Sequence, residues 1–233
     1  MNIGIYSGVN AARTSERRLE GIAANLANAD TTGFKRVSTS VEAIRLKNGS
    51  ESDLALRTNA QTDFTQGPLE HSSSPFHLAL MGPGFFAAEG PKGELYTRNG
   101  TFRVDDQGTL QTTEGYPVAW ERRGTPINPT GEVITVDGTG VVRQGANELG
   151  KLKVTDFADR AGLQPLGDGY FLAGPGDREV AAEGVVHQHS LEGSNVSSID
   201  ELVALISIQR NFESARSVMT LIDQSYGRLT QSR

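Results

Sequence analysis

The stretch "FHLALMGPGFFAAEGPKGELYTRNGTFRV" (Phe76–Val104) decides the fold class. Short apolar runs alternate here with turn signals, and the first run places every second residue on one face. Asn99-Gly100 separates two such runs, and both central residues of a type I′ hairpin turn need positive φ, which Asn-Gly tolerates. The stretch therefore predicts antiparallel strands with a hairpin turn at Asn99-Gly100.

The same pattern continues to about His187 through "VITVDG", "GVVRQ", "KLKVTDF" and "GYFLAG". Apolar runs at roughly ten-residue spacing, separated by polar turns, indicate an antiparallel sheet rather than βαβ units. No helical period interrupts them. We therefore expect a central antiparallel all-β domain over 75–186, and the pattern does not choose between a barrel and a sandwich.

Both ends of the chain differ from this centre because they carry a helical period. Ile3–Ala27 has a narrow apolar stripe with alternating gaps of four and three, allowing for Glu16 in the same series. Ile199–Leu229 has the same alternation without a fault. The predicted seam residues are Ile5, Val9, Ala12, Leu19, Ala23, Leu205, Ile208, Phe212, Ala215, Met219, Ile222, Tyr226 and Leu229.

A single stripe of this kind is ordinary for a helix that faces the core of a globular fold. Two narrow stripes at opposite chain ends favour helix against helix, because a narrow seam buries poorly on a sheet. Ser197 or Ser198 is placed to cap the second helix, with Asp200 and Glu201 in its first turn. The expected fold class is α+β, with the terminal helices paired as a coiled coil.

Four segments follow from these patterns. They are an N-terminal helix with an Asn-rich motif (1–36), an extended linker (37–74), the β domain (75–186), and a linker with the C-terminal helix (187–233). The linker assignment depends on Arg57–Ser74, which is polar and contains Gly-Pro and a serine run.

Composition excludes several classes of function. The 233 residues have a net charge of −6 and no basic block, which argues against nucleic-acid binding. No apolar run is long enough to insert directly into a membrane, and the first residues do not resemble a secretory signal peptide. Cysteine is absent, so disulfides and thiolate chemistry are excluded.

The sequence also contains no pattern typical of an active site. His187 and His189 have a spacing that could ligate a metal, but no third ligand follows, and a loop or edge strand explains them better. The Asp-rich turns lack the distal Glu of a calcium loop. We therefore predict no catalytic residue, no metal and no cofactor.

Three segments together resemble the axial proteins of the bacterial flagellum, the rod and hook family. They are "IAANLANADTTGFKR" near the start, "FHLALMGPGFFAAEGPKGELYTRNGTFRVDDQGTLQTTEGYPV" in the middle, and "LEGSNVSSIDELVALISIQRNFESARSVM" near the end. The chain departs from the family pattern at Ala24, where a second asparagine is usual, and this puts one polar contact in doubt. The 233 residues leave no room for the extra domains of hook proteins.

The resemblance assigns motif residues in each segment. Those of the N-terminal motif are Asn25, Leu26, Asn28, Thr32, Gly33, Phe34 and Lys35. Those of the β-domain motif are Gly84, Phe85, Phe86, Tyr96, Thr97, Arg98, Asn99, Gly100 and Phe102. Those of the C-terminal motif are Leu191, Glu192, Ser194, Asn195, Val196, Gln209 and Arg210.

The resemblance implies a structural subunit of the basal-body rod, and it favours the proximal rod over the distal rod. Its terminal helices would pair in the inner tube of a helical assembly, transmit torque and surround the export channel. Copies of itself, other rod proteins and the flagellar type III export apparatus are the implied partners. The implied location is the rod in the periplasm, reached without a cleaved signal peptide. The alternative from the residues alone is a β-domain binding module with a dimerising helical stalk.

The stretch "NLANADTTGFKR" (Asn25–Arg36) receives two interpretations. Its amides and the backbone around Gly33 can make hydrogen bonds to an adjacent subunit. An ordinary helix end, for which Asn28 and Gly33 suffice, is the simpler alternative. We expect the interface role because of the family resemblance.

Overall fold

The computed structural model describes residues 3–45, 54–91 and 93–231, and the chain divides into two compact units. The first, which we call the helical unit, comprises Met1–Ala29, Arg36–Asp63 and Val196–Arg233. The second, the β unit, comprises Asp30–Lys35 and Phe64–Asn195. This division differs from the expected one, because 30–35, 64–74 and 187–195 pack within the β unit.

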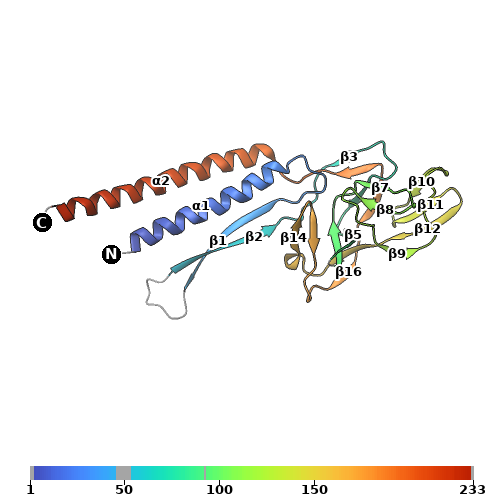
Figure 1. Ribbon diagram of the computed structural model, residues 1–233, viewed down its shortest axis with the longest axis horizontal. Coiled ribbons are helices and arrows are strands. Elements are labelled where there is room, and N and C mark those ends of the chain that lie inside the picture. The colour runs from blue at the N-terminus through green and yellow to red at the C-terminus, as the bar shows by residue number, and fades with distance from the viewer. Residues whose placement is uncertain (1–2, 46–53, 92, 232–233) are drawn as a thin grey trace. The chain divides into compact units, whose positions relative to one another are not determined.

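The helical unit contains α1 (Ile3–Ala27), α2 (Ser198–Gln231) and a hairpin of β1 (Val37–Arg45) and β2 (Leu54–Thr62). The two helices lie side by side, and the hairpin lies along α1 (Figure 1). Strand pairing is antiparallel, from Val37 opposite Thr62 outward to the last described pair. We expected an extended linker over 37–74, but β1 and β2 in its first part pair as a hairpin.

The start of α2 follows from its capping residue. Ser197 Oγ accepts a hydrogen bond from the Asp200 N–H at 3.4 Å, and its carbonyl oxygen accepts one from the Glu201 N–H at 3.0 Å. Ser197 is therefore the N-cap, and Asp200 and Glu201 lie in the first turn, where the helix dipole favours negative charge. This confirms the predicted helix start and chooses Ser197 over Ser198.

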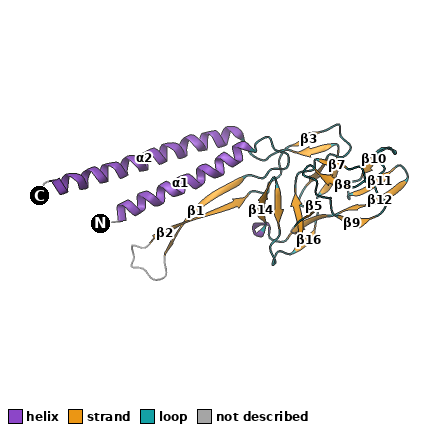
Figure 2. Cartoon of the chain, in the orientation of Figure 1, coloured by secondary structure: helices purple, strands orange, loops and turns teal. Residues whose placement is uncertain are grey.

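The β unit consists of short antiparallel strands, and its one described helical element is a 3-10 turn at Arg160–Gly162 (Figure 2). The strands are β3 (Leu69–His71), β4 (Leu78–Met81), β5 (Phe85–Gly90), β6 (Gly93–Thr97), β7 (Phe102–Val104), β8 (Leu110–Thr112), β9 (Trp120–Arg123), β10 (Ile134–Val136), β11 (Val141–Gln144), β12 (Asn147–Leu152), β13 (Val154–Phe157), β14 (Gln164–Gly167), β15 (Tyr170–Leu172), β16 (Glu179–Ala181), β17 (Val185–Gln188) and β18 (Ser190–Glu192).

These strands form two larger sheets and three strand pairs. The larger sheets have the orders β14-β15-β6-β5-β13-β16 and β10-β11-β12-β9, and the pairs are β17-β4, β18-β3 and β7-β8. The pairs β17-β4 and β18-β3 bring the end of the unit against its beginning. Every strand pairing among the described residues of the unit is antiparallel, which confirms the predicted antiparallel β domain.

Two hydrophobic cores lie on opposite sides of β5. Phe85 and Phe86 are neighbours in an extended strand, so their side chains point to opposite faces. Phe86 belongs to the larger core and packs edge-on against Phe102 at a ring distance of 5.2 Å. Phe85 belongs to the smaller core, where Tyr96 and Phe157 also lie. The Gly-Phe-Phe motif thus supplies one aromatic ring to each core.

The hairpin predicted at Asn99-Gly100 is wrong. β6 pairs with β5 and β15, whereas β7 pairs with β8, so the strands on either side of Asn99-Gly100 do not pair with each other. The Gly100 carbonyl oxygen instead accepts a hydrogen bond from the Leu78 N–H at 3.1 Å. A Cβ at Gly100 would lie 1.6 Å from the Leu78 carbonyl oxygen. The glycine is needed for close approach of two backbones rather than for a turn.

Candidate functional site

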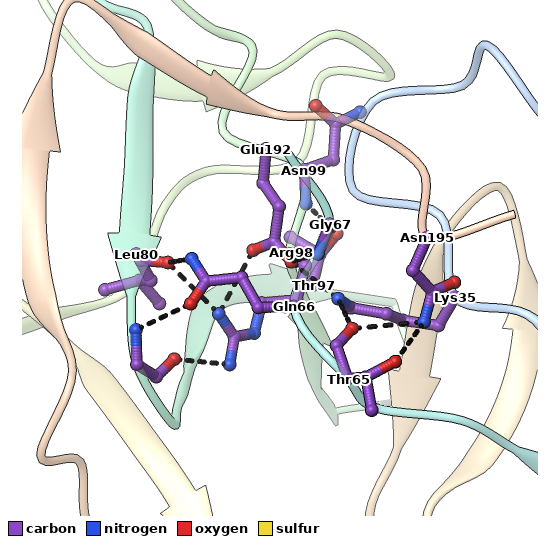
Figure 3. Close-up of polar contacts among 11 residues, drawn as sticks. Lys35, Thr65, Gln66, Gly67, Leu80, Thr97, Arg98, Asn99, Glu192 and Asn195 are labelled. Carbon is purple, nitrogen blue, oxygen red and sulfur yellow. Dashed lines mark hydrogen bonds and ion pairs between the residues drawn. The ribbon is translucent and has the colours of Figure 1, made fainter. Parts of the chain in front are cut away.

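The three sequence motifs meet in the β unit at the carboxylate of Glu192, which is fully buried (Figure 3). Glu192 Oε1 accepts hydrogen bonds from Lys35 Nζ at 2.5 Å and from the Gly67 N–H at 3.1 Å. Glu192 Oε2 accepts one from Arg98 Nη1 at 3.1 Å. Each motif therefore contributes one ionic side chain to a buried group, Lys35, Arg98 and Glu192, which we call the charge triad.

Arg98 is held on several sides. Its Nη1 and Nη2 donate to the carbonyl oxygens of Leu80 at 3.3 Å and Gly82 at 2.8 Å, and its guanidinium carbon lies 5.4 Å from the centre of the Phe85 ring. Burial lowers the pKa of Arg98, and the Glu192 carboxylate opposes that shift by favouring the cation. Arginine remains protonated in proteins, so the guanidinium is a fixed positive charge.

The N-terminal motif enters the β unit as a short inserted segment. Lys35 Nζ also donates to the Thr65 carbonyl oxygen at 2.7 Å, and the Gly33 N–H donates to the Glu192 carbonyl oxygen at 2.6 Å. Gly33 has φ of +70°, and a Cβ there would lie 2.4 Å from the Asn99 nitrogen. Positive φ and close approach both require glycine at this position.

The C-terminal motif meets the same neighbours. The Asn195 N–H donates to the Phe34 carbonyl oxygen at 3.4 Å, and Asn195 Nδ2 donates to the Thr65 carbonyl oxygen at 3.0 Å. The Gly193 N–H donates to the Pro68 carbonyl oxygen at 2.8 Å. The segments 30–35, 64–68 and 192–195, which the chain uses to enter and leave the β unit, are therefore tied to one another.

The charge balance of the triad makes Glu192 its critical member. Two buried cations share a single carboxylate, and breaking a buried ion pair by removing one partner is strongly destabilising because the other charge stays uncompensated. Removal of Lys35 or Arg98 leaves a neutral pair, whereas removal of Glu192 leaves two cations. The arrangement holds chain segments together.

Within the helical unit, Asn25 connects α1 to the hairpin. Its Nδ2 donates to the Val37 carbonyl oxygen and its Oδ1 accepts from the Val37 N–H, both at 2.9 Å. Arg36, the residue before Val37, is held to α2 because its guanidinium pairs with the buried Glu201 carboxylate at 2.5 Å. The Asn25 side-chain amide thus makes the same pair of hydrogen bonds to the Val37 backbone that a residue of a neighbouring strand would make.

Burial of Asn25 and Lys35 differs from the expectation that they contact an adjacent subunit. Asn25 is 1% exposed and Lys35 is 2% exposed, because their polar groups bind partners within the chain. Leu26, Thr32 and Phe34 are half-buried. We therefore restrict the interface proposal for this motif to partly exposed side chains.

Replacing Asn25 by alanine is expected to destabilise the helical unit by about 1–3 kcal/mol, because the Val37 N–H and C=O lose their partners. Thermal unfolding followed by far-ultraviolet circular dichroism measures the change. Asn59→Ala, at an exposed position of the same hairpin, is the matched control and should have little effect. Equal effects of both substitutions would show that the Asn25 contacts contribute nothing.

The predicted seam residues lie partly between α1 and α2. Ala12, Leu205 and Ile208 are half-buried, whereas Ala23, Phe212 and Leu19 are exposed, Leu19 to 36%. A groove of about 650 Å³ runs between the two helices, and its apolar lining comes from Ala12, Leu19, Ile208 and Phe212. The side chains at Ile5, Val9, Ala215, Met219, Ile222, Tyr226 and Leu229 lie outside the described residues.

The remaining motif residues have structural roles or exposed positions. Thr97 Oγ1 donates to the Gly169 carbonyl oxygen and accepts from the Asn99 N–H. Gly84 has φ of +137°, and Leu191 lies in β18 opposite Glu70. The residues of the C-terminal motif outside the charge triad divide between buried Ser194, half-buried Asn195 and Val196, and exposed Gln209 and Arg210 on α2.

Sequence reasoning missed the partners of these motifs. Glu192 lies 157 residues from Lys35 and 94 from Arg98, and no local pattern links them. Gln188 and the Arg36–Glu201 pair were not singled out either, although a charged residue inside an apolar motif is a signal for a buried ion pair.

Among the described residues, no group of three or more His, Cys, Asp or Glu side chains is placed to hold a metal ion. None of the described helices is long and apolar enough to cross a membrane.

Comparison with known proteins agrees with this division into motifs. Residues 5–35 match the family model for flagella basal body rod proteins. Residues 79–144 match the flagellar hook protein FlgE/F/G D1 domain, and residues 187–232 match the C-terminal model of flagellar basal body rod FlgEFG proteins. The three matched regions contain Lys35, Arg98 and Glu192, respectively.

Relatives match along nearly the whole chain. The flagellar basal-body rod protein FlgF of Caulobacter vibrioides is 33% identical, over 94% of this chain and 93% of the relative. FlgG of Agrobacterium fabrum is 32% identical, also over 94% and 93%. FlgF of Salmonella typhimurium is 33% identical, over 99% and 98%. With its three motifs joined in one buried triad and its length shared with these relatives, the chain belongs to the flagellar basal-body rod protein family and is a structural rod subunit rather than an enzyme.

Proposed function

We propose that the chain polymerises through its terminal helices, with copies of itself and other rod proteins, into the drive shaft that transmits torque and surrounds the export channel. The observation that carries this proposal is an apolar face at the start of α2. Ile199, Leu202, Val203 and Ile206 are 74%, 47%, 60% and 50% exposed, and their spacing places them on one side of the helix. Contiguous exposed apolar surface of this kind marks an interaction site.

A second face of the same helix supports pairing with α1. Leu205 and Ile208 are half-buried, and Ile208 lines the groove beside α1. In our proposal α1 and α2 continue this contact as a coiled coil, and the outward apolar face packs on a neighbouring copy. A contact between two different surfaces of neighbouring copies gives an open helical filament when its rotation does not close into a ring, and we propose this open form.

The charge triad suits a subunit under load. The chain passes between the helical unit and the β unit through residues adjoining 30–35, 64–68 and 192–195, and the triad ties these segments within the β unit. In our proposal this tie keeps the β unit attached to the chain ends while the helices carry the torque.

We propose that the chain is a proximal rod subunit rather than a distal rod subunit. Its opening "IYSGVNAA", its "DFTQGPLE" and its modest length favour the shorter subunit type. We further propose a periplasmic position, reached through the flagellar type III export apparatus without a cleaved signal peptide.

Substituting Leu202 and Ile206 together by aspartate is expected to abolish rod assembly, because two charges would be buried where helices pack between subunits. The variant is expressed in cells that lack their own copy, and swimming together with isolated basal bodies is scored. Asn211→Asp, at an exposed position of α2, is the control and should swim normally. Normal rods from the double variant, with its circular dichroism unchanged, would contradict the proposed interface.

A further inference from the structure

The last segment of the β unit, Val185–Asn195, contacts parts of the unit that are distant in sequence. We call it the closing segment. Its first half is β17, which pairs with β4 and contributes Val186 to the larger core. Its second half contains β18, which pairs with β3. The Val186 N–H donates to the Gly138 carbonyl oxygen at 3.0 Å, so the segment also joins the turn after β10.

Gln188 strengthens this attachment through its side chain. Its Nε2 donates to the carbonyl oxygens of Pro75 at 2.8 Å and Ile134 at 2.9 Å, and its Oε1 accepts from the Val136 N–H at 3.1 Å. One amide thus satisfies three backbone groups on two separate parts of the unit. Without the closing segment these groups lose their partners.

The charge triad makes the stability of the β unit depend even more strongly on the closing segment. Glu192 belongs to the closing segment and is the carboxylate that neutralises Lys35 and Arg98. Both cations are buried, with side chains 0% and 3% exposed. A β unit that lacked residues 185–195 would bury two uncompensated charges or expose both to water by opening the surrounding strands.

We propose that the closing segment is an integral part of the cooperative β unit and that residues 64–184 do not hold their two cores without it. The β unit then stays unfolded until the chain is complete through Asn195. Because a chain is synthesised from its N-terminus, this dependence delays folding until nearly all of the chain has been made. That delay would suit export of an unfolded chain, a consequence that rests on the proposed function, whereas the folding dependence itself does not.

Native-state hydrogen exchange on the full-length wild-type chain tests this inference. The amides of Val186 and Gly193 report the closing segment, and those of Ala87 and Ala119, bonded to Lys153 O and Ala87 O, report the centre of the unit. If the unit opens as a whole, all four amides have protection factors within about tenfold of one another. Closing-segment amides protected more than tenfold less than Ala87 and Ala119 would overturn the inference.

Two matched variants give a second readout. Gln188→Ala removes three side-chain hydrogen bonds from the closing segment, and Gln144→Ala removes three of the same kind from a surface turn around Asn128. Gln188→Ala should lower the protection of Val186 and Ala87 by the same factor. The Gln144 bonds are exposed, so water can replace them, and Gln144→Ala should lower the protection of Ala87 and Val186 equally but by a much smaller factor. Loss of protection at Val186 alone in Gln188→Ala would overturn the inference, and it would leave the assembly proposal untouched.

Discussion

A chain carrying Glu192→Gln is expected to lose about 3–5 kcal/mol of the β unit's free energy of unfolding, because two buried cations then lack their carboxylate. Glutamine preserves the shape, and its carbonyl oxygen can still accept hydrogen bonds, whereas its NH2 group cannot, so the loss reports the missing charge together with one lost acceptor. Urea denaturation followed by the fluorescence of Trp120, the one tryptophan in the chain, measures the change within the β unit.

Glu148→Gln is the matched control for this substitution. Glu148 pairs with Arg122 on an exposed part of the same unit, with side chains 40% and 73% exposed. Exposed ion pairs contribute about 0–1 kcal/mol because water and salt screen them. If Glu192→Gln changed stability no more than Glu148→Gln does, the triad would have no special role in holding the β unit.

Gly100→Ala is expected to prevent the β unit from folding. The new Cβ would lie 1.6 Å from the Leu78 carbonyl oxygen. This oxygen belongs to the backbone, so no rotation of a side chain can relieve the clash. Leu78 is 1% exposed in the larger core, so the strand cannot move without opening that core. We expect loss of the cooperative Trp120 transition, a cost above about 4 kcal/mol, which is at the extreme for one substitution.

Gly176→Ala separates this clash from the general effect of replacing a glycine. Gly176 is exposed, has no positive φ, and a Cβ there would meet nothing within 4 Å. The alanine is expected to be neutral or stabilising by up to about 1 kcal/mol, because it restricts the unfolded chain. A Gly100→Ala chain with a normal unfolding midpoint would mean that the close approach of Gly100 to Leu78 is absent.

The helices were predictable because their signals are local. The seam periodicity and the capping serine need only neighbouring residues, and both terminal helices begin and end close to the expected positions. The hairpin of β1 and β2 was missed although both strands alternate, with Val41 and Leu56 at positions of one face and Glu42 and Arg57 at positions of the other. The alternation is weak because Thr and Ala fill several positions of the less polar face. The Asn99-Gly100 hairpin failed because tertiary contact with Leu78, rather than turn geometry, requires this glycine.

The motif positions were predictable from resemblance, but their physical role was not. Lys35 directly follows Phe34 and Arg98 lies two residues after Tyr96, a pattern compatible with an exposed interface as well as with a buried ion pair. Only the fold brings them to Glu192, across 157 and 94 residues of sequence. Asn25 illustrates the same limit, because its expected partner was another subunit and its observed partner is Val37.

The most direct test of this account is a double-mutant cycle on Lys35→Met and Glu192→Gln in the full-length chain, with stability measured by Trp120 fluorescence in urea. We predict that the two changes are strongly coupled, by about 2 kcal/mol or more, as found for close charge pairs in buried sites. Effects that add without coupling would contradict the claim that the terminal and central motifs form one buried charge triad.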